Sequence, residues 1–208
     1  MIGYPNHKKR CNSSAQLSQN HIGRGMSLED DLNSSNAYYL EIDRALIHKK
    51  PTPIQVVKVD YPKRSSAKII EAYYKVPSTT DYNGIYRQRA IDFEAKETRS
   101  KTSFPFKSIH EHQIRHLERV LLHGGIGFFI LRFTSHNETY LIDAAIMIEM
   151  YRQIETKSIS YEMVKKHGVF IREGITPRLH YLDCVDELYF KDKTSSKKEN
   201  QTIKNFSG

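Results

Sequence analysis

The sequence predicts an α/β fold in which a mixed central β-sheet is flanked by helices and carries a protruding β-hairpin. Residues 127–133 are almost continuously apolar, as in a central strand that is buried on both faces. Residues 91–96 alternate apolar and charged side chains, so they predict a strand with Glu94 and Lys96 on the same face. Residues 108–122 repeat apolar side chains at the spacing of an amphipathic helix.

Size and charge narrow the class of protein. The chain has 208 residues and a formal net charge of +8, which fits one domain and an anionic partner. It has no run of about 20 apolar residues and no apolar core of a secretion signal near its start, so we favour cytoplasmic nucleic acid over a membrane. Cys11 and Cys184 lack metal-ligand spacing, and both fit a reducing compartment.

Three segments divide the chain. Residues 1–22 are polar and basic without a sustained period, and we expect a flexible N-terminal arm. Residues 23–190 hold the apolar patterns and form the predicted domain. Residues 191–208 are polar and Lys-rich, and we expect a disordered tail.

The predicted domain begins with a helix that Ser27 can cap, followed by acids in its first turn. Its predicted buried face consists of Leu28, Leu32, Tyr39 and Ile42. Arg24 stands just before the helix between two glycines, where a backbone can approach a phosphate, so Arg24 is a candidate DNA contact.

A long hairpin is predicted at about 54–76, after a short strand at 45–48. Its strands are 54–59 and 68–76. Its candidate DNA contacts are Lys58, Lys63, Arg64 and Lys68, together with Tyr73 and Tyr74, whose rings could stack on unpaired bases. The alternative is an edge strand kept soluble by lysines, with tyrosines that only pack.

The helix predicted at 108–122 starts at Ser108, which can cap it, and stops at Gly124 and Gly125. Its predicted inner stripe is Ile109, Gln113, Leu117, Val120 and Leu121. A buried Gln113 needs partners, so its side chain either bridges backbone groups or faces a metal through its carbonyl oxygen. A strand at 138–142 and helices at 144–152, 160–166 and 181–190 complete the predicted elements.

Two acids and a lysine are the main candidates for catalysis. Asp81 precedes Asn83-Gly84, a turn signal that could fold Asp81 back beside Glu94 and Lys96. Paired carboxylates can hold a divalent cation, and a lysine can stabilise charge on a phosphoryl group, so the set suits metal-assisted phosphodiester hydrolysis. The alternative is a solvated ion pair on a strand surface.

Three histidines offer a weaker metal motif. His112 and His116 have the i, i+4 spacing of a zinc pair, and His110 lies nearby. The order lacks the His-Glu-x-x-His pattern, and no third ligand follows at a useful spacing. We therefore prefer phosphate-facing or solvated histidines.

Several strings of the sequence carry a resemblance to a known family. The acid, spacer and Glu-x-Lys arrangement resembles the PD-(D/E)xK nuclease superfamily. The longer strings resemble the RecU Holliday junction resolvases; they are Gly23–Met26, Ile47–Pro53, Ser78–Gly84, Ile91–Thr98 and His112-Gln113. The resemblance covers about Gly23 to Phe190.

The resemblance implies a restriction-endonuclease-like nuclease core that resolves four-way DNA junctions by paired symmetric nicks and leaves 5′-phosphates. It implies one or two Mg²⁺ ions per active site, with Mn²⁺ as a substitute. The ligands would match Thr79, Asp81, Glu94 and Gln113, and Lys96 would stabilise the transition state.

The resemblance also implies a homodimer that acts in homologous recombination and DNA repair, near the nucleoid in the cytoplasm, alongside recombinase and branch-migration proteins. The hairpin would be the family's stalk, with contacts at Lys49, Arg64, Tyr73 and Tyr74. Tyr74 departs from the Phe of the family but keeps the ring. The competing classes are a non-catalytic junction-binding architectural protein and a sequence-specific endonuclease of the same superfamily.

Overall fold

The computed structural model describes residues 26–61, 67–75, 79–153 and 157–191. The predicted arm, almost all of the predicted tail, and the candidate contacts Arg24, Lys63 and Arg64 lie outside these residues.

The described residues form a mixed α/β domain. Its helices are α1 (Leu28–Glu41), α2 (Glu111–Leu122), α3 (Ala144–Arg152), α4 (Tyr161–His167) and α5 (Tyr181–Tyr189), with a 3₁₀ turn, η2 (Phe106–Ser108). Its strands are β1 (Leu46–Lys49), β2 (Ile54–Asp60), β3 (Lys68–Tyr74), β4 (Tyr82–Tyr86), β5 (Arg89–Thr98), β6 (Ser103–Pro105), β7 (Ile126–Phe133), β8 (Glu138–Asp143), β9 (Ser158–Ser160) and β10 (Val169–Phe170).

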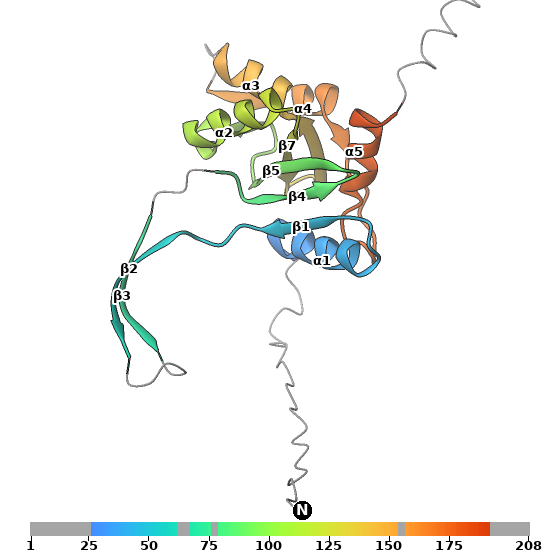
Figure 1. Cartoon of the computed structure of the whole chain (residues 1–208). Coiled ribbons are helices and arrows are strands. Elements are labelled where there is room, and N and C mark those ends of the chain that lie inside the picture. The colour runs from blue at the N-terminus through green and yellow to red at the C-terminus, as the bar shows by residue number, and fades with distance from the viewer. Residues whose placement is uncertain (1–25, 62–66, 76–78, 154–156, 192–208) are drawn as a thin grey trace, which may run out of the picture.

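The central sheet has the order β1-β4-β5-β7-β8-β10, in which β5 and β7 are parallel and the other neighbours are antiparallel. This confirms the predicted mixed sheet. The helices cover both of its faces, with α2 and α3 above it and α1 below it in Figure 1. Among the described helices, none is long and apolar enough to cross a membrane.

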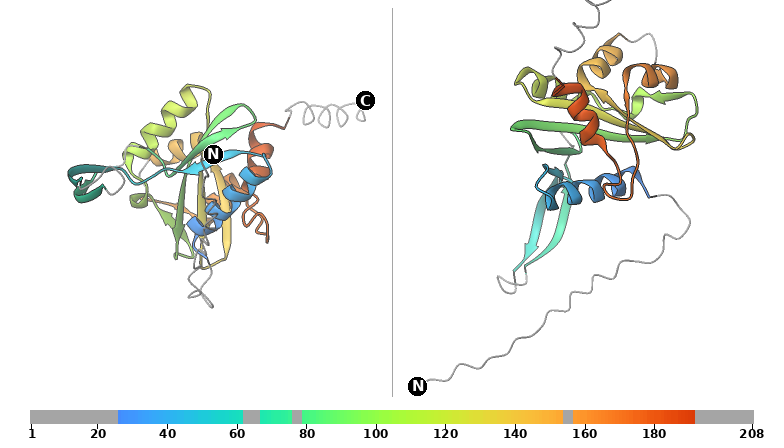
Figure 2. Two further views of the ribbon diagram at one scale, coloured as in Figure 1. Left: turned by 60° about the horizontal axis from the view of Figure 1, so that its bottom comes forward. Right: turned by 90° about the vertical axis from the view of Figure 1, so that its right-hand side faces the viewer.

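Strand β7 is buried along its whole length, as predicted. Its side chains alternate between two apolar cores: Phe128 packs with α1 and α5, whereas Phe129 packs with α2 and α3. The views in Figure 2 show the sheet between these two layers. Because both faces are covered, a strand of apolar residues is the stable choice at this position.

The predicted Asn-Gly turn is wrong, because Asn83 and Gly84 lie inside β4. The turn between β4 and β5 falls at Arg87 and Gln88, which both have positive φ angles. Gly84 is needed for another reason. A Cβ atom there would lie 2.0 Å from the carbonyl oxygen of Leu46 on β1, so only glycine lets the two strands pair.

Two details of the predicted helices are also wrong. The cap of α2 is His110 and not Ser108, which ends the preceding 3₁₀ turn. Ile42 is exposed, because α1 ends at Glu41 before another turn could bury it. Ser27 caps α1 as predicted, and its hydroxyl accepts from the backbone N–H of Asp30 at 3.2 Å.

Strands β2 and β3 form a two-stranded ribbon of their own, which projects away from the domain (Figure 1). We call this ribbon the stalk. Nearly all of its described side chains are exposed on both faces. The stalk is therefore not an edge of the central sheet, which excludes the edge-strand alternative.

Candidate active site

The pairing of β4 with β5 brings Asp81 beside Glu94. Tyr82 lies opposite Phe93 in the antiparallel ladder, so the residues just outside this pair face each other. The backbone N–H of Asp81 donates to Oε2 of Glu94 at 3.2 Å. The two acids thus converge, as the sequence predicted, although a strand and not a turn places them.

Lys96 lies between the two acids. It is two residues after Glu94 on β5, so both side chains are on the same face of the strand. Its Nζ forms an ion pair with Oε1 of Glu94 and lies 3.8 Å from Oδ2 of Asp81. The predicted set of two carboxylates and one ammonium is therefore a single cluster.

Glu94 is completely buried, with an exposed fraction of 0%. Burial and the neighbouring Asp81 raise the pKa of Glu94 to about 8, although Lys96 opposes the change. Its Oε1 has the Lys96 ion pair but no well-directed hydrogen bond from the described residues. The surrounding donors therefore do not satisfy an ionised Glu94, and burial favours its protonated form when no metal is bound.

Thr79, Asp81, Lys96 and Gln113 line one cleft of about 980 Å³, with Glu94 buried behind it. Gln113 is buried at the start of α2, and its Oε1 accepts from the backbone N–H of His110 at 2.9 Å. The side chain thus meets a backbone group, one of its two predicted alternatives. Its carbonyl oxygen keeps a second lone pair, which leaves the other alternative open.

The chemistry of this set fits a divalent cation. Carboxylate, amide and hydroxyl oxygens are the ligands that Mg²⁺ accepts, and a dication would stabilise the ionised form of the buried Glu94. The described residues contain no cluster of three or more His, Cys, Asp or Glu side chains placed to hold a metal ion. A histidine zinc site therefore finds no support in this part of the chain, whereas the proposed site combines two acids with two neutral oxygens.

The three histidines of α2 and its cap have different surroundings. His116 is partly exposed, and its Nε2 lies 3.0 Å from the carboxylate of Asp92, which occupies this nitrogen. His112 stacks on His110 with ring centroids 5.4 Å apart, and its buried Nε2 has no hydrogen-bond partner among the described residues. Burial, with the positive charge of His110 and Lys96, lowers the pKa of His112, which favours a neutral ring.

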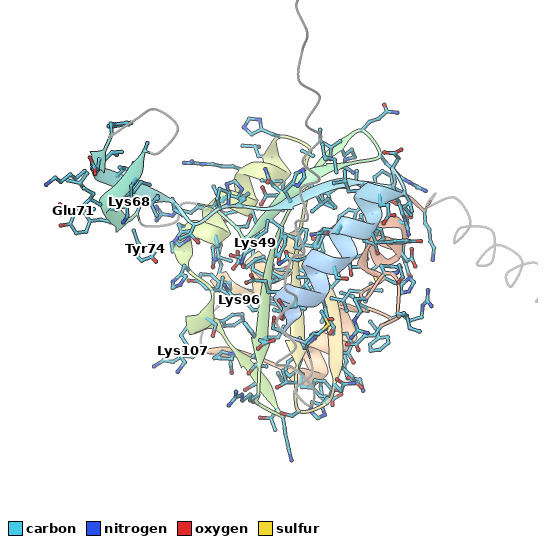
Figure 3. All side chains as sticks on the ribbon, turned by 90° about the horizontal axis from the view of Figure 1, so that it is seen from below. Lys49, Lys68, Glu71, Tyr74, Lys96 and Lys107 are labelled. Carbon is cyan, nitrogen blue, oxygen red and sulfur yellow. The ribbon has the colours of Figure 1, made fainter. Side chains whose placement is uncertain are left out.

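The candidate DNA contacts fall in two places. Lys49 lines the cleft and forms an ion pair with Glu29 of α1. Lys58, Lys68, Tyr73 and Tyr74 lie on the stalk and are exposed, Tyr74 by 83% and Tyr73 by 60%. Figure 3 labels Lys49 and Lys96 on the domain and Lys68 and Tyr74 on the stalk.

Two further residues of the site, Asp92 and Lys50, were not assigned from the sequence. Asp92 is 7% exposed and contacts Lys50, Thr80 and His116. Burial alone would raise the pKa of Asp92, but hydrogen bonds from these three side chains outweigh it and hold the pKa below its usual value. The sequence feature that could have identified Asp92 is the period-two pattern of residues 91–96. This pattern places Asp92 on the same face of β5 as Glu94.

The mixed sheet and the Asp81, Glu94 and Lys96 cluster have the arrangement expected of the PD-(D/E)xK nuclease superfamily. The model of the family "Recombination protein U" matches residues 23–187. The chain belongs to the RecU family, which confirms the resemblance seen in its sequence strings.

Curated relatives match nearly the full length of the chain. "Holliday junction resolvase RecU" of Geobacillus kaustophilus is 52% identical over 196 residues, which are 91% of this chain and 98% of that relative. The protein of the same name from Oceanobacillus iheyensis is 50% identical over 91% of this chain and 100% of the relative. The structure of a Holliday junction resolvase, Archaeoglobus fulgidus Hjc, overlaps 67% of this chain with 8% identity and a TM-score of 0.39.

Proposed function

We propose that this protein is a Mg²⁺-dependent Holliday junction resolvase that nicks two opposing strands of a four-way junction symmetrically. The observation that carries the proposal is the cluster of Asp81, Glu94 and Lys96 in a cleft that adjoins the stalk, in a chain about half identical to relatives named as resolvases. The proposal includes a role in homologous recombination and DNA repair.

Thr79, Asp81, Glu94 and Gln113 would hold one or two Mg²⁺ ions, or Mn²⁺ in their place. A bound metal supplies Lewis-acid polarisation of the scissile phosphate and a water of lowered pKa. Asp81 and Glu94 would supply carboxylate oxygens as ligands, and the backbone N–H of Asp81 holds the Glu94 carboxylate in place. Lys96 offers its ammonium to the charge that develops on the phosphoryl oxygens, and the products would be a 5′-phosphate and a 3′-hydroxyl.

The stalk would select the junction. A four-way junction has an open centre, and a narrow ribbon with exposed lysines and tyrosines can enter it and stack on unpaired bases. Symmetric nicking requires two active sites, so the proposal includes a homodimer. It also includes a cytoplasmic, nucleoid-associated location and contact with recombinase and branch-migration proteins.

One assay tests the proposal. The protein is incubated with a synthetic four-way junction and a matched linear duplex, with and without Mg²⁺, and both labelled strands are mapped at nucleotide resolution. We expect paired nicks at symmetric positions in the junction, only with Mg²⁺, and little cleavage of the duplex.

The other two candidate functions give different results in the same assay. Cleavage of the duplex at a fixed sequence would identify a sequence-specific endonuclease. Retention of the junction without cleavage, at any Mg²⁺ or Mn²⁺ concentration, would identify an architectural protein. Binding should weaken steeply with salt in every case, because lysine contacts release counterions from phosphates.

A further inference from the structure

Asp92 is a second buried acid on the catalytic face of β5. Its carboxylate accepts from Nζ of Lys50 at 3.0 and 3.2 Å, and Nε2 of His116 lies 3.0 Å from Oδ2. The hydroxyl of Thr80 makes a third contact, to Oδ1. We call these four residues the Asp92 network.

The members of the Asp92 network also contact one another. Nζ of Lys50 also donates to the hydroxyl of Thr80 at 3.0 Å, so the ammonium bridges both groups. The side chains of Lys50 and Asp92 are only 18% and 11% exposed. A buried ion pair with additional hydrogen bonds holds its geometry tightly, and removal of one partner leaves the other charge uncompensated.

Two partners of Asp92, Thr80 and His116, come from segments that carry a proposed metal ligand. Thr80 stands between Thr79 and Asp81, and Asp92 itself is two residues before Glu94. His116 is one helical turn after Gln113 on α2. Asp92 therefore lies on one of the three segments that carry the proposed ligands and contacts the other two.

Lys50 connects Asp92 to the base of the stalk. It follows β1 directly, and the chain reaches β2 only four residues later. Its backbone N–H donates to the carbonyl oxygen of Asp81 at 2.8 Å. Lys50 thus holds the base of the stalk to Asp81 through its backbone and to Asp92 through its side chain.

We propose that Asp92 and Lys50 are positioning residues, which fix the ligand-bearing segments relative to one another and anchor the stalk to them. Neither residue acts on the phosphate. The inference rests on the proposed function only where it names metal ligands. The contacts that it explains are present without metal.

The first test measures backbone hydrogen exchange in the metal-free protein. Asp92→Asn and Lys50→Met remove one charge each. We expect exchange about tenfold faster than in the parent protein at residues 79–82 and 111–117, because these segments lose their common anchor. Lys50→Arg retains the charge and should restore most of the protection.

Asp31→Asn is the matched control. Asp31 is also a buried acid, held by Arg132 at 2.7 Å and Arg178 at 3.0 Å, and none of these residues lines the cleft. This variant separates a general loss of stability from a local effect. If Asp92→Asn and Lys50→Met change exchange only as much as Asp31→Asn does, the proposal is overturned; if Asp92→Asn does not fold, Lys50→Met decides.

The second test measures Mn²⁺ binding to the protein alone by electron paramagnetic resonance. We expect Asp92→Asn and Lys50→Met to bind Mn²⁺ about tenfold more weakly or worse, and Asp31→Asn to bind it as the parent does. Unchanged Mn²⁺ affinity in both network variants would overturn the proposal. A parent protein that never cuts a junction would refute the proposed function instead, and the exchange comparison would still stand.

Discussion

The backbone N–H of Asp81 donates to the carboxylate of Glu94 across 3.2 Å, so the two acids are joined through the main chain as well as through Lys96. This hydrogen bond uses the main chain of Asp81, so a change in the Asp81 side chain leaves it in place, whereas a change in Glu94 alters its acceptor.

Asp81→Asn tests the proposed metal site. The amide keeps the shape of the side chain but removes its charge, and a bound metal supplies several kcal/mol of transition-state stabilisation. We expect junction cleavage to fall about 10³-fold, since each factor of ten corresponds to about 1.4 kcal/mol. Junction binding in a gel-shift assay should remain. Loss of binding and cleavage together would contradict the assignment.

The raised pKa of Glu94 predicts that the free energy of unfolding depends on pH. In the metal-free folded protein Glu94 holds its proton up to pH about 8, whereas in the unfolded chain it ionises near pH 4.5. The folded state therefore binds more protons between these values, and the contribution of Glu94 to the free energy of unfolding is lost as the pH rises through this window. The decline cannot exceed about 1.4 kcal/mol per pH unit.

Glu94→Gln is the reference for that measurement. Urea unfolding of both proteins in EDTA at pH 5, 6, 7 and 8 isolates the contribution of Glu94, since the other groups are common to both. We expect the difference between parent and variant to fall with pH. A difference that is flat across this range would show that Glu94 titrates normally. Mg²⁺ should bind more tightly as the pH approaches 8, because binding displaces the proton.

Tyr74→Ala tests stacking by the stalk. The ring is 83% exposed and contributes little to the cores, so the thermal midpoint should stay unchanged. Base stacking on an aromatic ring contributes about 1 to 3 kcal/mol, so we expect junction affinity to fall tenfold or more. Tyr74→Phe keeps the ring and should bind like the parent. Equal losses on junction and duplex would mean that the ring does not select junctions.

Gly84→Ala tests the close pairing of β1 with β4. The added Cβ would meet the carbonyl oxygen of Leu46 at 2.0 Å, which forces the strands apart. We expect a loss of roughly 3 kcal/mol or more in the free energy of unfolding, at the upper end of overpacking costs. Chemical denaturation measures it. Gly124→Ala serves as the contrast, because its Cβ would meet no atom within 4 Å and only its positive φ opposes the change.

Local patterns in the sequence predict much of the fold. Three features depend only on residues that are close together in the sequence. They are the apolar run of β7, the alternation of β5 and the capped start of α1. The convergence of Asp81 with Glu94 was also predicted, but from a turn at Asn83-Gly84, where the structure has strand β4 instead. The resemblance supplied Thr79 and Gln113 as ligand candidates, which the pattern of the strands alone does not identify.

Other features depend on contacts between distant residues. Asn83-Gly84 has the composition of a turn, but β1 passes so closely that the glycine is needed inside a strand. Lys50 and Asp92 are separated by 42 positions, and their contact depends on the register of β1, β4 and β5. Such a pair has no local signature, so the sequence could not predict the Asp92 network.

The way in which the stalk joins the domain has a consequence for how such proteins change during evolution. The stalk is inserted between β1 and β4, which are already neighbours in the sheet, with Lys49 paired to Tyr82. Hydrogen bonds from Lys50 to Asp81 and from Lys75 to Pro53 tie its two ends together at the base. A short turn could therefore replace the insertion without altering the sheet. If the stalk selects the substrate as proposed, a single insertion or deletion at this position would exchange substrate choice and leave the proposed hydrolytic site unchanged.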